Sequence, residues 1–316
     1  MGAFFASLSN LISSMPGAVA QGIIWGIMAI GVYITYKILD LADLTVDGSF
    51  ATGGMVLVVC TTGGLNIYLA VLLAFLVGCL TGLVTGLLHT KFGIPAILAG
   101  ILTQIALYSV NLRISGGKSN LPLSVQKFHL LLSLRNIPKA ILVGGLFAVV
   151  IIALLYWFFG TELGHSLRAT GCNQAMARAN GINTSTNKII GFIISNGIVA
   201  LSGGLLSQYQ GFADVKMGQG AIVIGLASVI IGEVLFGKLF KNFALKLVAA
   251  VFGGIIYYIV ITFVLWLGLN ANDLKLFSAI VVAVFLGIPY WRKKLSESRI
   301  KSVDEPAKTE GGADNA

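Results

Sequence analysis

The chain has 316 residues, of which 57% are hydrophobic and only 10% are charged, and its mean hydropathy is +0.92. Soluble domains carry roughly 25% charged residues, so this composition excludes a soluble globular protein and indicates a polytopic membrane protein. The formal net charge of +9 would suggest a nucleic-acid partner in a soluble chain, but basic loop residues that orient a membrane protein explain it better, and we expect no nucleic acid.

Apolar runs of about 20 residues match the roughly 30 Å hydrocarbon layer of a bilayer. In chain order, we expect such segments at 16–36, 49–62, 66–88, 94–112, 139–160, 188–210, 218–236, 247–268 and 274–291. They predict an all-α integral membrane protein with about 8–10 transmembrane helices, surrounded by membrane lipid. After Trp291 the residues are charged and include Pro and Gly, which is typical of disorder. The sequence thus predicts a transmembrane domain over 1–291 and a disordered tail over 292–316.

Two segments are introduced by polar residues and look like broken or re-entrant half-helices. The 49–62 segment follows LADLTVDGS and is too short to span the bilayer as a straight helix, and the 218–236 segment follows YQGFADVKMGQG. An Ala-Asp pair precedes both, at Ala42-Asp43 and at Ala213-Asp214, although the glycines that follow do not align in register. Interrupted segments in corresponding positions of two halves point to an inverted repeat around a transport path.

Glycines spaced four apart predict closely packed helices. Gly78, Gly82 and Gly86 share one helix face, and Gly22 and Gly26 repeat the spacing. Small residues at this spacing let two helix backbones approach each other. We expect packing within one subunit rather than a dimer contact.

The basic residues predict the orientation in the membrane. If every segment crosses and the tail lies inside, 14 basic side chains lie inside and 7 outside. This bias favours a multi-pass protein of the plasma membrane with a cytoplasmic C-terminus and an outer N-terminus. It also places the polar segment 161–187 in the cytosol.

That polar segment interrupts an otherwise apolar chain and reads LRATGCNQAMARANGINTSTNK from Leu167 onward. Asn173 can cap a short helix, and Gly181 suits the left-handed position after its end. A short helix rich in small residues that projects from a membrane domain suits insertion into a groove of another protein. An ordinary cytoplasmic loop is the alternative.

Motifs for covalent or metal chemistry are weak. The His and Cys residues are far apart and show no metal-binding spacing, so we expect neither a metal site nor an enzyme. The run GEVLFGKL fits the start of a phosphate-binding loop, but Leu239 stands where Ser or Thr must hold magnesium. The acidic residues fall at or near segment ends, which argues against an ion-coupled carrier and for energy supplied by a partner. An ion-coupled secondary transporter and a membrane-embedded enzyme remain as alternatives.

Several of these features together resemble a known family. The residues are Leu167-Arg168-Ala169, Gly171, Asn173, Ala177 and Gly181-Ile182, with the Gly-rich half-span after Asp214 and LADLTVDGSF near the start. They are similar to permease subunits of ABC importers, and most closely to the branched-chain amino-acid and ribose-type permease family. The TVDGSF version resembles a branch linked with uptake of amino acids, in some members aromatic ones. Where the family has an acidic residue after the loop glycine, this chain has Cys172-Asn173.

The resemblance implies a permease domain over 1–291 that translocates a small solute, an amino acid before a sugar or nucleoside. It implies a homodimer, docked on two cytoplasmic ABC ATPase subunits that bind the ATP and supplied by an extracytoplasmic solute-binding protein, so that the chain itself needs no cofactor. Arg168 would brace the loop or pair with an ATPase carboxylate. The residues to which the resemblance assigns ATPase coupling are Arg168, Ala169, Gly171, Asn173, Ala177, Arg178, Gly181 and Ile182.

Polar residues in the broken segments and their neighbours are candidates for the translocation path. They are Thr52, Gln104, Tyr108, Asn196, Gln208 and Gln219. A polar residue in a membrane helix also serves as a contact between helices, which is the alternative for each of them.

The outer loop between the fourth and fifth segments is basic against the orientation bias, at Arg113, Lys118, Lys127 and Arg135. A basic surface would steer the acidic lobes of a binding protein to this face. The alternative is an interfacial amphipathic segment over 121–137. It would place Leu121, Leu123, Phe128, Leu130 and Leu131 among the lipid headgroups.

Overall fold

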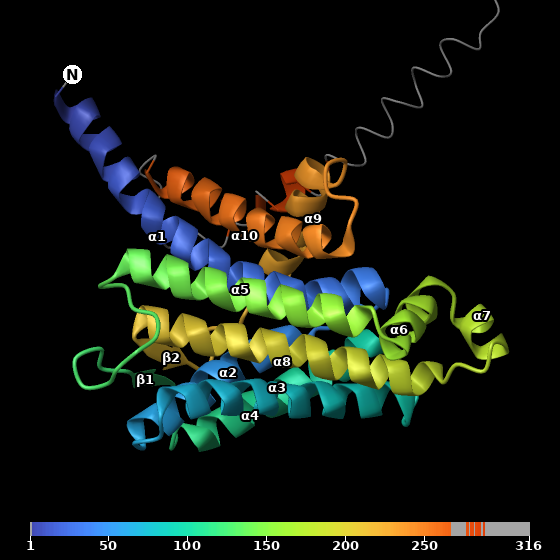
Figure 1. Cartoon of the computed structure of the whole chain (residues 1–316). Coiled ribbons are helices and arrows are strands. Elements are labelled where there is room, and N and C mark those ends of the chain that lie inside the picture. Colours follow the sequence, from blue (N-terminus) through green and yellow to red (C-terminus); the bar gives the residue numbers. More distant parts are fainter. Residues whose placement is uncertain (1, 267–275, 278, 281, 286, 288–316) are drawn as a thin grey trace, which may run out of the picture.

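The structure, a computed structural model, describes residues 2–266, 276–277, 279–280, 282–285 and 287, with side chains from residue 11 onward. The predicted tail at 292–316 and parts of the predicted segments 247–268 and 274–291 lie outside these residues. The chain forms a bundle of long helices, with two short helices projecting at one end and a small pair of antiparallel strands at the other (Figure 1).

The predicted helical architecture is confirmed in its coarse form. The elements are α1 (Gly2–Tyr33), the π-helical turn η1 (Ile34–Ile38), α2 (Thr45–Thr62), α3 (Ile67–Thr90), α4 (Ala96–Ile114), β1 (Asn120–Pro122), α5 (Ile137–Phe159), α6 (Glu162–Cys172), α7 (Gln174–Ala179), α8 (Thr184–Gln210), β2 (Phe212–Asp214), α9 (Ala221–Phe236) and α10 (Phe243–Trp266). Among the described residues, six helices are long and apolar enough to cross a membrane, whereas α9 is shorter. These six are the helices containing Leu11–Ile38, Ile67–Thr90, Ala96–Ile114, Ile137–Phe159, Thr184–Gln210 and Phe243–Trp266.

The all-α prediction is wrong in one detail, because β1 and β2 pair as antiparallel strands with Leu121 opposite Ala213. Both segments lie just beyond the ends of long helices, where their backbone groups have no helical partners. Pairing the strands satisfies the N–H and C=O groups that a buried loop would otherwise leave without hydrogen bonds.

The glycines spaced four apart lie where two helices of the same subunit pack closely, as predicted. A Cβ atom at Gly82 of α3 would collide with the carbonyl oxygen of Phe192 in α8, and one at Gly26 of α1 would lie 2.9 Å from Cα of Val251 in α10. Such distances are possible only for glycine, since any side chain would separate the two backbones. The α3–α8 and α1–α10 pairs are therefore closely packed parts of the bundle.

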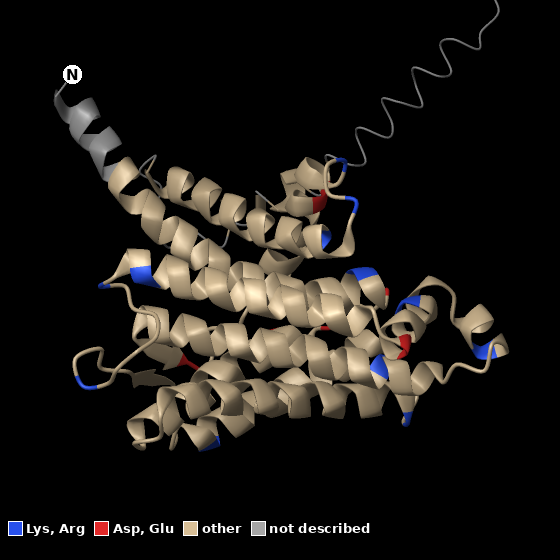
Figure 2. Cartoon of the chain, in the orientation of Figure 1, with Lys and Arg blue, Asp and Glu red and all other residues tan. Residues whose placement is uncertain are grey.

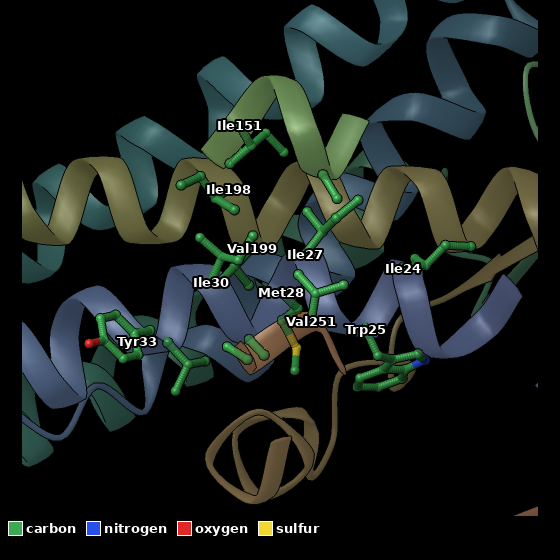
Figure 3. Close-up of a cluster of buried hydrophobic side chains, with 14 of the residues drawn as sticks. Ile24, Trp25, Ile27, Met28, Ile30, Tyr33, Ile151, Ile198, Val199 and Val251 are labelled. Carbon is green, nitrogen blue, oxygen red and sulfur yellow. The ribbon is translucent and has the colours of Figure 1, made fainter. Parts of the chain in front are cut away.

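The main core lies where α1 and α8 meet. Ile24, Ile27 and Ile30 of α1 pack with Ile198 and Val199 of α8 (Figure 3). Two serine hydroxyl groups of α8 reinforce this contact: Ser195 Oγ donates to the Gly31 carbonyl at 2.8 Å, and Ser202 Oγ donates to the Ile24 carbonyl at 2.7 Å. Lys and Arg gather at the two ends of the bundle and are rare along its middle (Figure 2). This distribution fits a bundle that crosses a membrane with its long axis.

Candidate functional site

The predicted cytoplasmic segment forms the two projecting helices α6 and α7 (Figure 1). Asn173 ends α6 and caps α7, because its Oδ1 accepts the Met176 N–H at 3.0 Å. After α7, Gly181 has a φ of +77°, and its N–H donates to the Arg178 carbonyl at 2.9 Å. The local structure predicted for this stretch is confirmed, while its role as a contact for ATPases remains a prediction.

Most of α7 faces outward. Met176 is 65% exposed, and Arg178 and Ala179 are also exposed. Ala177 is buried instead, and the Ile182 N–H donates to its carbonyl at 3.0 Å. α7 is thus fixed on one side and presents alanine, methionine and arginine side chains on the other.

Arg168 braces α6 against two neighbouring helices. Its guanidinium lies 4.1 Å from the ring centre of Phe243 in α10 and 5.2 Å from that of Phe159 in α5. Within the described part of the chain, no carboxylate approaches it within 4.0 Å, and the ion pair found there joins Lys37 to Glu233. A cation over an aromatic face is stabilised by the partial negative charge of the π-electrons on that face. The bracing role is the one that this geometry supports.

The other face of α6 contacts the chain that leads into α2. A Cβ atom at Gly171 would collide with the carbonyl oxygen of Ile38 at the end of η1. On α8, Asn187 Nδ2 donates to Thr170 Oγ1 at 2.9 Å and to Ser166 Oγ at 3.1 Å. The predicted coupling segment, which we define as residues 161–187, therefore contacts α10 through Arg168 and the entry to α2 through Gly171, and Asn187 at the start of α8 ties α6 to α8.

The same kind of turn occurs before each of the two predicted half-helices, two residues before α2 and seven residues before α9. Asp43 Oδ1 accepts the Thr45 N–H at 2.9 Å before α2, and Asp214 Oδ1 accepts the Lys216 N–H at 2.7 Å before α9. In both places the aspartate bonds to the backbone two residues further on, which fixes a turn. The Ala-Asp pairs noted in the sequence are thus equivalent in local structure.

Asp43 lies deeper than its place in the sequence indicates. It is 1% exposed, and its Oδ2 accepts Asn196 Nδ2 at 2.7 Å near the middle of the membrane-length helix α8. Asn196 Oδ1 accepts Ser49 Oγ at 2.7 Å, and Ser49 Oγ lies 2.7 Å from Thr81 Oγ1 of α3. The expectation that acidic residues lie at span ends is wrong for Asp43, because the half-helix starts inside the bundle. Hydrogen bonds compensate the burial of its carboxylate.

Asp47 joins the beginnings of α2 and α9. Its Oδ2 accepts the Gly220 N–H and its Oδ1 accepts the Ile222 N–H, both at 2.9 Å. A carboxylate at this position satisfies free N–H groups of the helix start and interacts favourably with the helix dipole. The start of α9 is therefore held by a side chain of α2.

A polar cavity of about 480 Å³ opens beside this junction. Its polar lining residues are Asp47, Gln104, Tyr108, Ser109, Asn111, Lys216 and Gln219. Gln104, Tyr108 and Gln219 were predicted as path residues, and the structure brings these three together. Asp47, Ser109, Asn111 and Lys216 also line the cavity but are not among the predicted path residues. Asp47 and Lys216 lie in the polar stretches before the two half-helices, which is the signal that could have identified them.

The other three path candidates lie away from this cavity. Thr52, Asn196 and Gln208 are each 0% exposed. Thr52 Oγ1 donates to the Gly48 carbonyl at 2.8 Å, and Gln208 Oε1 accepts the Leu131 N–H at 3.0 Å. These side chains bond to the backbone and to neighbouring helices, as the alternative interpretation expected.

The outer basic residues lie at the end of the bundle opposite α7. Arg113, Lys118, Lys127 and Arg135 are exposed, and no carboxylate among the described residues lies within 4.0 Å of them. For five apolar side chains of 121–137, the structure favours contact with the protein core over the interfacial interpretation. Leu123 is 2% exposed, and Leu121, Phe128, Leu130 and Leu131 pack against the same core as Ala213 and Val215.

No group of three or more His, Cys, Asp or Glu side chains that could hold a metal ion occurs in the part of the chain that the structure describes.

Comparison with known proteins gives a family and several relatives. Residues 14–289 match the family described as branched-chain amino acid transport system / permease component. A tyrosine transport system permease protein of Clostridioides difficile is 43% identical over 296 residues, which cover 94% of this chain and 97% of that protein. An uncharacterized protein of Rickettsia prowazekii is 34% identical over 85% of this chain and 95% of its own length. An autoinducer 2 import system permease protein of Yersinia pseudotuberculosis is 29% identical over 47% of this chain and 42% of its own length. No solved structure matches.

Proposed function

This chain belongs to the family of branched-chain amino acid transport permease components, and we propose that it imports an aromatic amino acid, with tyrosine as the first candidate. It is the membrane-spanning permease of an ABC importer and not itself an enzyme. The proposal of an aromatic substrate is supported by the relative named as a tyrosine permease, which aligns over 94% of this chain. A sugar or a nucleoside is the alternative substrate class.

We assign the translocation path to the polar cavity beside the start of α9, and this cavity is the observation that carries the proposal. Asp47 and Lys216 both line it without forming an ion pair with each other. A free amino acid carries an ammonium and a carboxylate group, so unpaired charges of both signs suit its recognition. Gln104, Tyr108 and Gln219 add uncharged hydrogen-bonding groups.

The path lies between two halves of an inverted repeat in which α1, α2 and α3 correspond to α8, α9 and α10. Under this correspondence the α1–α10 pair is equivalent to the α8–α3 pair, and both pairs pack closely through glycines. The equivalent turns at Asp43 and Asp214 support it further. Half-helices that begin near the middle of the bundle are the usual place for a substrate path in such repeats.

We infer that two copies of the chain form the permease. Two cytoplasmic ATPases bind to the coupling segments of these copies. α7 supplies the exposed contact, while α6 transmits the movement through Arg168 to α10 and through Gly171 to the entry of α2. ATP binds only to the ATPases. Movement of the helices around the cavity would expose it alternately to the two sides of the membrane.

We also place the protein in the plasma membrane, with the permease domain over 1–291 and a cytoplasmic tail over 292–316. The exposed outer cations Arg113, Lys118, Lys127 and Arg135 would receive an acidic binding protein. Reversing the charges of Arg113 and Arg135 should weaken that docking, more so at low salt, because salt screens exposed charges.

The test is uptake by the purified complex of permease, ATPase and binding protein in proteoliposomes. The proposal expects uptake of labelled tyrosine that requires ATP and the binding protein, and that excess unlabelled tyrosine abolishes. Uptake driven by a proton or sodium gradient without the ATPase would contradict the assignment, and so would competition by a sugar or nucleoside but not by amino acids.

A further inference from the structure

A second polar cavity, of about 530 Å³, lies at the end of the bundle where α5, α6 and α10 meet. Arg168 and His165 of α6 line it, together with Asn242 just before α10, and none of its described lining residues is acidic. It shares no lining residue with the cavity at Asp47. A hollow of positive character therefore exists outside the proposed translocation path.

The charge of Arg168 remains available to a ligand in this cavity. Its guanidinium lies against the rings of Phe159 and Phe243, which also line the cavity, and no described carboxylate lies within 4.0 Å of it. Arg168 is half-buried, and no described residue accepts a hydrogen bond from it, yet none of its nitrogens is closed off from solvent. Its N–H groups can therefore donate to an anion, and hydrogen bonds between two charged groups are stronger than neutral ones.

An apolar groove of about 240 Å³ begins beside this cavity, and Trp157 of α5 lines both. The floor of the groove includes Ile151 and Ile198, which belong to the main core (Figure 3). The α5 residues of the groove extend from Ile151 to Phe158, which is about 10 Å along the helix axis. The other lining residues are also apolar: Phe75, Leu154, Leu155 and Ile194. The groove thus runs from the polar cavity along helices of membrane length.

Exposed aromatic side chains mark the level at which the cavity joins the groove. Trp157 is 71% exposed and Tyr156 is 52% exposed, close to the end of α5 at Phe159. Trp and Tyr are enriched at the depth of the lipid headgroups. The short helix α6, which carries Arg168, is not among the helices long enough to cross a membrane. The cavity therefore lies at the level of the headgroups and the groove at the level of the acyl chains.

We propose that the cavity and the groove together bind one anionic phospholipid, with its phosphate at Arg168 and part of an acyl chain in the groove. Basic pockets between membrane helices suit acidic headgroups. An acyl chain gains little by entering the groove, because the surrounding lipid is just as apolar, so the headgroup charge determines which lipid binds. The bound lipid joins α5, α6 and α10 beside the predicted coupling segment. The site does not depend on which solute the permease transports.

The first experiment measures binding of phosphatidylglycerol and phosphatidylcholine to the purified, delipidated permease by native mass spectrometry. Both lipids contain phosphate, but only phosphatidylglycerol has a net charge, and the wild type should prefer it about fivefold, the effect of one basic residue near a membrane surface. Arg168→Gln should remove most of this preference. Lys91→Gln is the matched control, because Lys91 is an exposed cation at the end of the bundle where α8 begins, and it should keep the preference. No preference in the wild type, or the same preference in both variants, would overturn the proposal.

A second pair of variants tests the groove. Leu154 lines it and is 60% exposed, so Leu154→Trp fills the groove without overpacking the core. This variant should lose the phosphatidylglycerol that the wild type retains. Leu146→Trp, at a 57% exposed position of α5 outside the groove, should retain it.

Two further outcomes identify a different occupant. If soluble glycerol phosphate displaces phosphatidylglycerol at equal concentration, the ligand is a free phosphate and the acyl chain plays no part. If Leu154→Trp retains the lipid but no longer associates with a second copy of the chain, that copy covers the groove. Either result would contradict the lipid site, whereas weak competition by glycerol phosphate and loss of lipid with unchanged self-association would support it.

Discussion

The half-helices α2 and α9 both follow a turn made by an aspartate, but they are held in different ways. In α2, 14 of 18 residues are buried, whereas in α9 only 7 of 16 are. α2 touches α8 backbone to backbone, since a Cβ atom at Gly53 would collide with the carbonyl oxygen of Ala200. Near the start of α9, by contrast, Gly225 meets only side-chain atoms of Met28 and Val32. The comparison shows that α2 packs more closely along its length than α9 does, while Gly218, just before α9, meets the backbone of Asp47.

The two ends of α9 differ in the same way. Toward its C-terminal end, a Cβ atom at Gly232 would collide with the Ala249 carbonyl oxygen of α10, and Glu233 pairs with Lys37 at 2.8 Å. At its N-terminal end the helix itself is held by the carboxylate of Asp47, and the close backbone contact, of Gly218 with Asp47, lies just before the helix. Close backbone packing is lost only at a large cost, whereas hydrogen bonds can exchange with water or substrate. The junction between Asp47 and α9 is therefore where the path can open.

The largest expected effect comes from breaking the close packing at Gly53. Gly53→Ala should lower the free energy of unfolding by at least about 2 kcal/mol, because the backbone of Ala200 cannot move aside. The matched change on the other half-helix, Gly225→Ala, should cost less than about 1 kcal/mol, since side-chain ends can rearrange. Thermal unfolding of the two purified variants measures the difference. Equal stability of both would remove the contrast between the half-helices.

A smaller effect is expected from the junction itself. Asp47→Asn keeps the size of the side chain but loses its charge and one of its two acceptor oxygens, so the start of α9 is less firmly held. We expect ATP-driven uptake to fall about tenfold while the protein still assembles with its ATPase. The exposed Asp40 provides the control, and Asp40→Asn should transport normally. Equal activity of the two variants would contradict the role of Asp47.

The third effect concerns how movement reaches the two half-helices. Arg168→Lys keeps the positive charge but loses the flat group that covers Phe243 and Phe159. We expect the number of molecules imported per ATP hydrolysed to fall about threefold, because losing a partly exposed cation–π contact changes an equilibrium constant by about this factor. If Arg168 instead pairs with an ATPase carboxylate, lysine would replace it and the ratio would stay normal. Parallel assays of uptake and ATP hydrolysis distinguish the two roles.

Sequence patterns that act locally predicted the structure well. The cap at Asn173, the left-handed Gly181 and the glycine contacts of α3 all depend on residues within one helix or its ends. The Ala-Asp pairs likewise marked both half-helices, because a short turn needs only neighbouring residues.

Features that depend on distant contacts could not be read from the sequence. The depth of Asp43 follows from its bond to Asn196, which is 153 positions away, and the cavity at Asp47 requires α2, α4 and α9 to meet. The inward packing of Leu123 depends on β2, whose three residues are too few to give a strand pattern. For the same reason, only three of the six predicted path residues line the cavity. The identity of a polar residue in a membrane helix does not show which neighbouring helix or cavity it faces.

The most direct test of the account is the coupling between ATP hydrolysis and uptake in Gly181→Val. An added Cβ atom at Gly181 meets nothing within 4 Å, so the substitution causes no steric clash. It changes only the backbone, because a β-branched residue strongly disfavours the φ of +77° found there. Gly93 has a φ of +69° and equally open space, and Gly93→Val therefore provides a control with the same strain outside the coupling segment. The account predicts that Gly181→Val inserts and that its complex hydrolyses ATP but imports little tyrosine, while Gly93→Val imports normally. Normal import per ATP by Gly181→Val would contradict it.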